Sequence, residues 1–439
     1  MHLVSTNHRS PRAGFRDALR RGLAPDGGLY QPVGLPPVSE ADLRSWRGLP
    51  FDAVAQRLAR RLLDGEFTVD VLDRMVGEAL NFPVPVRPLG DGLWLLELFH
   101  GPTLAFKDFG ARFLARLFGE VLREHGGRAT VLVATSGDTG SAVARGFAGV
   151  PGTRVVVLYP AGKVTPFQEA QMATIGGNVT AVRVAGVFDD CQRLVKSALL
   201  DPGLADLQLS SANSINIGRL LPQTFYYVSS YLDVTDQPGA PVVFSVPSGN
   251  LGNLTAGVMA ARMGLPVRRF VAATNANDVL PEYLESGAFR ARPSIPTLSN
   301  AMDVGDPGNF ARLAAFYGAS PSRMAGEITG VRVSDAGTRA AIRDAHRRHG
   351  AILDPHAAVA YAAAVRYREA SGAPAPVIVL ATAHPAKFAD VIREELGVEP
   401  GLPDAERGWQ SRPLLAIDLA EASPAAFRDL LTSLGPVAS

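Results

Sequence analysis

Apolar stretches typical of strands alternate with stretches typical of helices from about residue 91 to residue 400. The strand-like stretches span residues 93–98, 129–135, 154–159, 179–184, 241–246, 267–273 and 377–381. The helical stretches span residues 139–147, 165–175, 188–200, 215–233, 251–263, 335–349, 355–368 and 385–396. Neighbouring parallel strands need a long crossover, which a helix usually supplies. The alternation therefore predicts an α/β fold in which helices cover parallel sheets.

The first 90 residues have a different pattern. Amphipathic helices are expected at residues 16–21, 51–63 and 69–80. Three prolines, at positions 83, 85 and 88, crowd the next segment, which is typical of a linker. We expect a mostly helical N-terminal domain over residues 1–90 and an α/β region over residues 91–400. The tail, residues 401–439, is expected to pack on the larger part of that region.

Charge and composition narrow the class of protein. The 43 basic and 42 acidic side chains leave a net charge of +1, which offers no basic surface for nucleic acid or an anionic membrane. One cysteine, Cys191, excludes an internal disulfide and is typical of a reducing compartment. The start of the chain lacks the apolar core of a signal peptide, and no run approaches the ~20 apolar residues of a membrane span. We expect a soluble cytoplasmic protein.

A lysine lies in an aromatic segment, Phe99 to Arg112, that joins a strand-like stretch to a helical one. Gly101-Pro102-Thr103 breaks the chain, and Thr103 is well placed as a helix N-cap. Lys107 follows in the first turns of the helix. The apolar face of this helix consists of Phe106, Phe109, Phe113, Leu114 and Leu117.

The neighbours of Lys107 leave two alternatives. An ammonium group in an apolar pocket is destabilised, so its pKa falls and its amine can attack a carbonyl, as a Schiff-base lysine must. Alternatively, Lys107 is an ordinary surface lysine, while Phe106 and Phe109 only pack in the core. Two glycine-rich turns further along the chain favour the first alternative.

Each of these turns stands between a strand and a helix. In Pro247-Ser-Gly-Asn-Leu-Gly-Asn253, converging backbone N–H groups and the N-terminus of the next helix would bind an anion, although the turn can also be an ordinary tight connection. In Thr135-Ser-Gly-Asp-Thr-Gly-Ser141, the donors suit a substrate carboxylate, and Asp138 either contacts a cofactor or caps the following helix. The hydroxyl groups of this second turn belong to Thr135, Ser136 and Thr139.

Further motifs follow in a fixed order from near the N-terminus to about residue 390. The lysine motif, His100-Gly-Pro-Thr-Leu-Ala-Phe-Lys-Asp108, stands among Ser5-Thr-Asn7, Leu23-Ala-Pro-Asp-Gly-Gly28, Ala134-Thr-Ser-Gly-Asp-Thr-Gly140, Ser211-Ala-Asn-Ser-Ile-Asn216, Val246-Pro-Ser-Gly-Asn250, Leu298-Ser-Asn-Ala-Met-Asp303, Asp354-Pro-His-Ala-Ala358 and Thr382-Ala-His-Pro-Ala-Lys387. In this order they resemble the long-chain group of the threonine synthases, which are pyridoxal-phosphate enzymes.

The resemblance implies the architecture of the fold-type II pyridoxal-phosphate enzymes. Two open parallel-sheet units would hold the cofactor, pyridoxal 5'-phosphate, between them, preceded by the helical domain. The smaller unit, about residues 128–212, would be mobile, and the rest of the α/β region would form the large unit. The implied reaction converts O-phospho-L-homoserine and water to L-threonine and phosphate, with Lys107 holding the cofactor and moving protons. We expect a monomer or homodimer.

The resemblance also assigns residues to the cofactor. The phosphate of the cofactor would lie on Gly249, Asn250, Leu251, Gly252 and Asn253. Asp138 would contact the cofactor, and Thr382 would be the partner of the pyridine nitrogen. A neutral hydroxyl there makes a weaker electron sink than the aspartate of many related enzymes. Thr382 can instead cap the helix that begins at Pro385.

The substrate phosphate needs cations and neutral donors, because a doubly charged group must be neutralised when it leaves water. Lys163 and Arg219 are the candidate cations, and Asn213 and Asn216 are the candidate neutral donors. Either cation can instead be a solvated surface charge, which is the usual state of Lys and Arg.

Two other functions are compatible with these motifs. A phospho-lyase acting on O-phosphohomoserine or O-phosphoserine, with a 2-keto acid as product, would share the lysine and the phosphate loop. A relative without activity would act as a binding protein, but it could readily lose Lys107 or the loop, and both are intact. No spaced His/Cys cluster indicates a metal, and Asp354 and His356 are expected to cap and pack.

Overall fold

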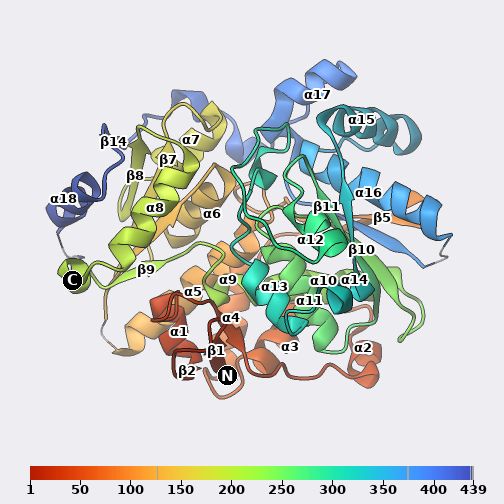
Figure 1. Ribbon diagram of the computed structural model, residues 1–439, viewed down its shortest axis with the longest axis horizontal. Coiled ribbons are helices and arrows are strands. Elements are labelled where there is room, and N and C mark those ends of the chain that lie inside the picture. The colour runs from red at the N-terminus through yellow and green to blue at the C-terminus, as the bar shows by residue number, and fades with distance from the viewer. Residues whose placement is uncertain (126, 373–374, 436, 438–439) are drawn as a thin grey trace.

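Two sheets of mostly parallel strands, on the left and right of Figure 1, form the body of the molecule. The structure is a computed structural model that describes residues 1–125, 127–372, 375–435 and 437. The larger sheet has six strands in the order β12-β11-β10-β13-β5-β4, and the smaller has five in the order β14-β8-β7-β6-β9. Every neighbouring pair is parallel except β4 and β5 at one edge. The predicted α/β fold is confirmed.

The central strands are continuous apolar runs because helices cover both faces of each sheet. The strands of the larger sheet are β4 (Val86–Gly90), β5 (Leu93–Glu97), β10 (Val242–Pro247), β11 (Val267–Thr274), β12 (Ile328–Arg332) and β13 (Val377–Ala381). The strands of the smaller sheet are β6 (Ala129–Ala134), β7 (Thr153–Pro160), β8 (Val179–Val184), β9 (Leu209–Ser211) and β14 (Ala416–Leu419).

The helices that accompany the smaller sheet are α5 (Lys107–His125), α6 (Asp138–Phe147), α7 (Pro166–Ala173), α8 (Phe188–Leu199) and α18 (Pro424–Leu434). Those that accompany the larger sheet are α9 (Ile217–Leu220), α10 (Gln223–Val234), α11 (Gly252–Arg262), α12 (Val279–Ser286), α13 (Phe310–Phe316), α14 (Pro321–Glu327), α15 (Asp335–His349), α16 (Pro355–Ser371) and α17 (Ala389–Leu396). Short 3₁₀ helices lie at Pro202–Leu207, Asn300–Met302, Pro385–Phe388, Asp404–Glu406 and Trp409–Ser411.

Local sequence explains several helix ends. The side chain of Asp354 accepts from the backbone amides of His356 and Ala357, Pro355 occupies the first turn of α16, and Gly372 closes the helix in the left-handed conformation. The single helix expected over residues 215–233 is divided into α9 and α10, because Pro222 between them has no N–H to continue the first helix.

The N-terminal region combines helices with a small sheet. Its helices are α1 (Phe15–Arg21), α2 (Glu40–Trp46), α3 (Phe51–Leu62) and α4 (Val69–Ala79), and its strands are β1 (His2–Ser5), β2 (Ala13–Gly14) and β3 (Tyr30–Pro32). These strands are too short to show a pattern in the sequence. Of the segment interpreted as a proline linker, Pro83 and Pro85 precede β4, and Pro88 lies in it. This strand is at the edge of the larger sheet, where a proline is tolerated because one side of the strand is unpaired.

The tail packs on the smaller unit, so the expectation that it packs on the large unit is wrong. Its strand β14 extends the smaller sheet by pairing in parallel with β8, and its helix α18 packs on α8. Leu419, Phe427 and Leu431 are buried there in one apolar cluster. Because β14 has only four residues and pairs with a strand far away in the sequence, no local sequence pattern predicts it. Within the described residues, no helix is long and apolar enough to cross a membrane.

Candidate active site

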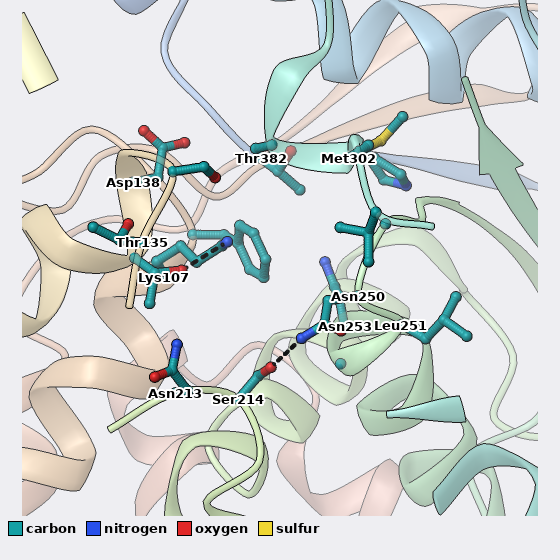
Figure 2. A pocket seen from close by; sticks show the side chains of 18 of the residues that line it. Lys107, Thr135, Asp138, Asn213, Ser214, Asn250, Leu251, Asn253, Met302 and Thr382 are labelled. Atoms are coloured by element: carbon teal, nitrogen blue, oxygen red, sulfur yellow. Dashed lines mark hydrogen bonds between the residues drawn. The ribbon is translucent and has the colours of Figure 1, made fainter. Parts of the chain in front are cut away.

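A cavity lies where strands of both sheets end, and Figure 2 shows its walls. The loops that follow the carboxyl ends of parallel strands are the usual place for a ligand in an open α/β sheet. The cavity is lined from the ends of β6 (Thr135), β9 (Asn213), β10 (Gly249) and β13 (Thr382) and from the start of α5 (Lys107). The sequence motifs that lie far apart in the chain therefore meet in one place.

Backbone contacts bring the lysine segment beside the end of β13. Ala105 forms a bridge with Ala383, and the backbone amide of His384 donates to the carbonyl oxygen of Leu104 at 3.0 Å. The helix begins at Lys107 itself, so Thr103 is not its N-cap. Thr103 instead donates through its backbone amide and its hydroxyl to the buried carboxylate of Asp108, at 2.8 Å each.

The amine of Lys107 points across the cavity to a hydroxyl group, as the dashed line in Figure 2 shows. Its Nζ donates to Thr139 Oγ1 at 3.0 Å and lies 5.4 Å from the centre of the Phe106 ring. Burial lowers the pKa of Lys107 from 10.5 to about 8; the carboxylate of Asp138 opposes this shift, and the cations of Arg219 and Lys387 add to it. At pH 7 about a tenth of the amine is therefore neutral, far more than for an ordinary lysine.

The glycine-rich turn after β10 leads into the N-terminus of α11, an end of a helix that suits an anion. Leu251, at the N-cap of α11, has the left-handed φ of 60°, which is uncommon for a residue with a side chain. A Cβ atom on Gly249 would lie 2.6 Å from Met302 Cα, so only glycine allows the two backbones to approach. Asn250 donates to Ser214 Oγ at 2.7 Å and holds the turn in place (Figure 2).

Asn253 carries an unused donor in the same turn. Its side-chain oxygen accepts from the hydroxyl groups of Tyr226 and Tyr227, at 2.8 and 2.7 Å. Its Nδ2 is buried and has no partner among the described residues. An unpaired buried donor is costly, so this amide fits a site that receives an acceptor from a ligand.

The turn after β6 is shaped by its own threonine. Thr135 Oγ1 accepts from the backbone amides of Gly137 and Gly140, both at 2.9 Å. A Cβ atom on Gly137, whose φ is 140°, would collide with the side chain of Gln168. Ser136 and Thr139 lie next to Thr135 in the cavity wall.

Asp138 points at a lysine that the sequence did not single out. Its Oδ1 accepts from Lys387 Nζ at 2.8 Å and from Gln168 Nε2 at 3.0 Å. Burial by itself would raise the pKa of Asp138, but the ammonium groups of Lys387 and Lys107 outweigh it and lower the pKa to about 2. The carboxylate makes no side-chain cap on α6, whose N-cap is Gly137.

Arg219 is an interior residue, not a surface charge. It is 2% exposed, its Nη1 donates to the carbonyl oxygen of Ala212 at 2.7 Å, and its Nε is buried without a partner in the described part of the chain. Burial lowers the pKa of Arg219 to about 10, so the guanidinium is still charged at neutral pH. Arg219 therefore lines the cavity as a buried cation.

Two predicted substrate residues do not line the cavity. Lys163 is exposed on the loop after β7. Asn216 is buried and donates to the carbonyl oxygens of Leu19 and Ser211, at 2.9 and 3.1 Å. Asn213 does line the cavity, but its side chain also pairs with both backbone groups of Ala134.

Thr382 and His356 complete the wall. Thr382 is buried in the lining and does not cap the helix at Pro385, because His384 fills that position. His356 Nδ1 lies 2.6 Å from Asp354 Oδ2, and its Nε2 accepts from the backbone amide of Ala301 at 3.1 Å. His356 therefore caps and packs as expected, while it also borders the cavity.

Comparison with known protein families gives three matches that together cover most of the chain. Residues 78–383 match the model described as pyridoxal-phosphate dependent enzyme. Residues 2–80 match the threonine synthase N terminus, and residues 357–431 match the threonine synthase C-terminal model.

Individual relatives agree with these matches over nearly the whole chain. The threonine synthase of Haemophilus influenzae is 41% identical over 423 residues, which cover 95% of this chain and 97% of the relative. The threonine synthase of Escherichia coli K12 is 40% identical, covering 98% and 99%. The structure of the pyridoxal-phosphate-bound threonine synthase from Brucella melitensis superimposes with a TM-score of 0.92 at 38% identity, covering 99% of both chains. A solved aspartate racemase, at 16% identity and a TM-score of 0.54, shares the fold alone.

Proposed function

Since the chain belongs to the threonine synthase family of pyridoxal-phosphate-dependent enzymes, we propose that it converts O-phospho-L-homoserine and water to L-threonine and phosphate. The observation that carries this proposal is the position of Lys107. Its amine, hydrogen-bonded to Thr139 at 3.0 Å, shares one cavity with the glycine turn at Gly249 and with the buried cation of Arg219.

The residues present fit the cofactor. The free Nδ2 of Asn253 and the backbone amides at the start of α11 suit its phosphate, and Gly249 keeps this surface open to the approach of a ligand. Lys107 is the residue to hold its aldehyde carbon, and Asp138 and Thr382 border the space for its ring. When bound, pyridoxal phosphate supplies an electron sink for negative charge that develops on the substrate. The residues proposed to hold the phosphate are Gly249, Asn250, Leu251, Gly252 and Asn253.

Lys107 is the proposed proton carrier. With the substrate in the cavity, Lys107 Nζ would take the proton from Cα of the substrate. An amine with a pKa of about 8 is suited to this task, since it can both accept and return a proton near neutral pH. Removal of a second proton, from Cβ, precedes loss of phosphate from Cγ. A proton then returns to Cγ, which becomes the methyl group, the hydroxyl of water adds at Cβ, and Cα regains its proton. Lys107 lines the cavity in which these steps would take place, and it is the proposed mobile base.

Arg219 is the proposed anchor for the substrate phosphate. Its buried positive charge would neutralise an anionic group that has left water, and its Nε, unpaired among the described residues, would add a donor. Asn213 provides a neutral donor at the same wall, and the hydroxyl groups of Ser136 and Thr139 suit the substrate carboxylate. Lys163 and Asn216 are omitted because neither side chain lines the cavity.

The chain is proposed to divide into an N-terminal domain, residues 1–90, and an α/β region, residues 91–400. Within that region, a smaller unit of about residues 128–212 moves against the larger one when substrate binds. Loops from both sheets line the cavity, so a movement of one sheet changes its width. The tail moves with the smaller unit, to which it is hydrogen-bonded.

We also propose that the protein works in the cytoplasm on a small-molecule substrate, without nucleic acid or a membrane as partner. The free, buried thiol of Cys191 is compatible with a reducing compartment, and a net charge of +1 gives no general attraction to anionic polymers. The proposed groups of the site all belong to one chain, so a monomer or a homodimer can carry out the reaction.

The experiment that tests the proposal is to incubate the protein with O-phospho-L-homoserine and pyridoxal phosphate and to identify the products by NMR. We expect threonine and phosphate in equal amounts. The competing activity, a phospho-lyase, would use the same lysine and the same phosphate turn, but would release a 2-keto acid and ammonia. Detection of a keto acid in place of threonine would therefore replace the proposed reaction with this one.

A further inference from the structure

The distribution of lysines in this chain is unusual. Only four of the 43 basic side chains are lysines, at positions 107, 163, 196 and 387, and all others are arginines. Lys163 and Lys196 are exposed. Lys107 lines the cavity, and Lys387 is 3% exposed directly behind its wall. A compact ammonium group and a planar guanidinium are not interchangeable when they are buried, so the geometry around Lys387 indicates why a lysine stands there.

The ammonium group of Lys387 is surrounded by three acceptors. Its Nζ lies 2.8 Å from Asp138 Oδ1, 2.9 Å from the carbonyl oxygen of Thr103 and 3.2 Å from Gln171 Oε1. An ammonium group has three N–H donors, so each acceptor can receive one. Lys387 is therefore fully satisfied in its buried position.

These contacts cross from one unit of the fold to the other. Lys387 lies in the 3₁₀ helix that follows β13 of the larger sheet, whereas Asp138 and Gln171 lie in α6 and α7 beside the smaller sheet. Lys387 is thus placed to fix the position of a carboxylate that belongs to the opposite unit.

Asp138 has two lysines within its reach but bonds to only one of them. Its carboxylate faces the charged or titratable groups of Lys387, Lys107 and His356, and Gln168 donates to it. In the described part of the chain, Lys107 forms no ion pair with Asp138 and donates to Thr139 instead. The carboxylate is held by Lys387 and Gln168, both of which bind its Oδ1.

We propose that Lys387 is a positioning residue that holds the carboxylate of Asp138 away from Lys107 and so keeps the Lys107 amine free for its chemistry. This inference rests on the proposed role of Lys107 as the cofactor lysine. Without Lys387, the carboxylate would turn to Lys107, the other ammonium group that acts on it. A closed pair between the two would stabilise the ammonium form of Lys107 at the expense of the free amine.

The proposal gives opposite signs for two substitutions. Lys387→Met removes a repelling cation and releases Asp138, so the titration midpoint of Lys107 should move up by about one pH unit or more. Asp138→Asn removes the attracting carboxylate, so the midpoint should move down by a similar amount. In the double variant no carboxylate is left to be positioned, so the midpoint should lie close to that of Asp138→Asn. Charged groups that also face this cluster, Arg219 and Asp108, are unchanged throughout.

The small number of lysines makes the measurement direct. Full-length protein labelled with ¹³C only at the lysine Cε atoms gives four side-chain signals in an NMR titration. The titration is run on the full chain without and with pyridoxal phosphate, for the wild type, both single variants and the double variant. Lys163 and Lys196 are internal references, and Lys196→Met is the matched control, since it removes an exposed lysine.

An unchanged Lys107 midpoint in Lys387→Met, or a shift in the same direction in both single variants, would overturn the proposal. If Lys387→Met does not fold because Asp138 is left buried and unpaired, Lys387→Gln takes its place, since its amide can still donate to Asp138 but carries no charge. An unchanged Lys107 midpoint in Lys387→Gln would then overturn the proposal. A rise from Asp138→Asn to the double variant as large as the rise from wild type to Lys387→Met would also overturn it, because it would show direct repulsion by Lys387 and no positioning of Asp138. These titrations need no turnover, so failure to form threonine with the predicted shifts present would refute the proposed function alone.

Discussion

The backbone amide of Phe106 donates to the carbonyl oxygen of Thr382 at 2.9 Å. This bond ties the residue before Lys107 to the residue that follows β13, and it places the first turn of α5 at the cavity wall. The lysine and the threonine that the sequence assigned to one cofactor therefore share a rigid backbone connection. Their relative position does not depend on a flexible loop, which is how a precise site is built.

Replacement of Lys107 should abolish turnover and keep the fold. Lys107→Ala removes the group proposed to hold the cofactor and to carry protons, so kcat should fall by about a thousandfold or more. The check is steady-state kinetics with O-phospho-L-homoserine, with circular dichroism to verify folding and Lys196→Ala as the control on an exposed lysine. Activity within about tenfold of the wild type, a change of about 1.4 kcal/mol in the barrier, would remove Lys107 from the mechanism.

Arg219→Met should weaken the use of the phosphorylated substrate. The substitution keeps much of the side-chain volume and removes the buried charge with its free Nε. We expect kcat/KM to fall by about 100-fold, which corresponds to about 2.7 kcal/mol. Inhibition by inorganic phosphate should weaken in parallel, while the spectrum of the bound cofactor is retained.

The control for Arg219 is Arg44→Met, which removes an exposed arginine that pairs with Glu40 on the surface of α2. The wild type should also use free homoserine very poorly, because hydroxide is a poor leaving group and the donors of Arg219 would stay unpaired. Unchanged kcat/KM and unchanged phosphate inhibition in Arg219→Met would place the substrate phosphate elsewhere.

Gly249→Ala should impair cofactor binding without unfolding the protein. The new Cβ would lie 2.6 Å from Met302 Cα, so the backbone of the turn or of its neighbour must move. We expect the Kd for pyridoxal phosphate to rise by about tenfold or more, which is about 1.4 kcal/mol. Gly326→Ala is the control, since a Cβ there meets nothing within 4 Å. Equal affinity of Gly249→Ala and the wild type would argue against a role of this turn in holding the phosphate.

Lys107 should destabilise the cofactor-free fold at neutral pH. Its pKa is 10.5 ordinarily and about 8 when folded, so between these values the unfolded chain binds the additional proton. The free energy of unfolding therefore rises with pH across this window, and the folded state bears the full cost of the ammonium below about pH 8.

Lys107→Met removes this cost, so its Tm at pH 7 without cofactor should exceed that of the wild type, by roughly 2 °C. The difference should shrink as the pH rises from 8 towards 10.5. Differential scanning calorimetry at several pH values checks both points. A difference in Tm that does not change with pH would show that folding does not lower the pKa of Lys107.

Much of the fold and of the site could be predicted from local sequence. The alternation of strands and helices predicted the parallel sheets, and the glycine turns next to strands marked the loops that line the cavity. These features depend on periodicity and on backbone freedom at glycine, both of which are local. The motif around Lys107 was recognised by its resemblance to a known family, and Phe106 and Lys107 of this motif line the cavity.

The parts that could not be predicted depend on distant contacts. Lys163 and Arg219 were equal candidates for the phosphate, because only the packed structure shows that one is exposed and the other buried. Lys387 stood in a known motif, but nothing nearby in the sequence indicates its bond to Asp138. The position of the tail was predicted wrongly for the same reason, because a strand of four residues can pair with any sheet edge that is free.

The most direct test of the central claim is reduction of the cofactor-loaded protein with borohydride, followed by peptide mapping. The chain has four lysines, so there are four positions at which a lysine-bound cofactor can be trapped. The account predicts that visible absorbance is lost on reduction and that the label is found on Lys107 alone. A label on Lys163, Lys196 or Lys387, or a protein that stays colourless when cofactor is added, would contradict it.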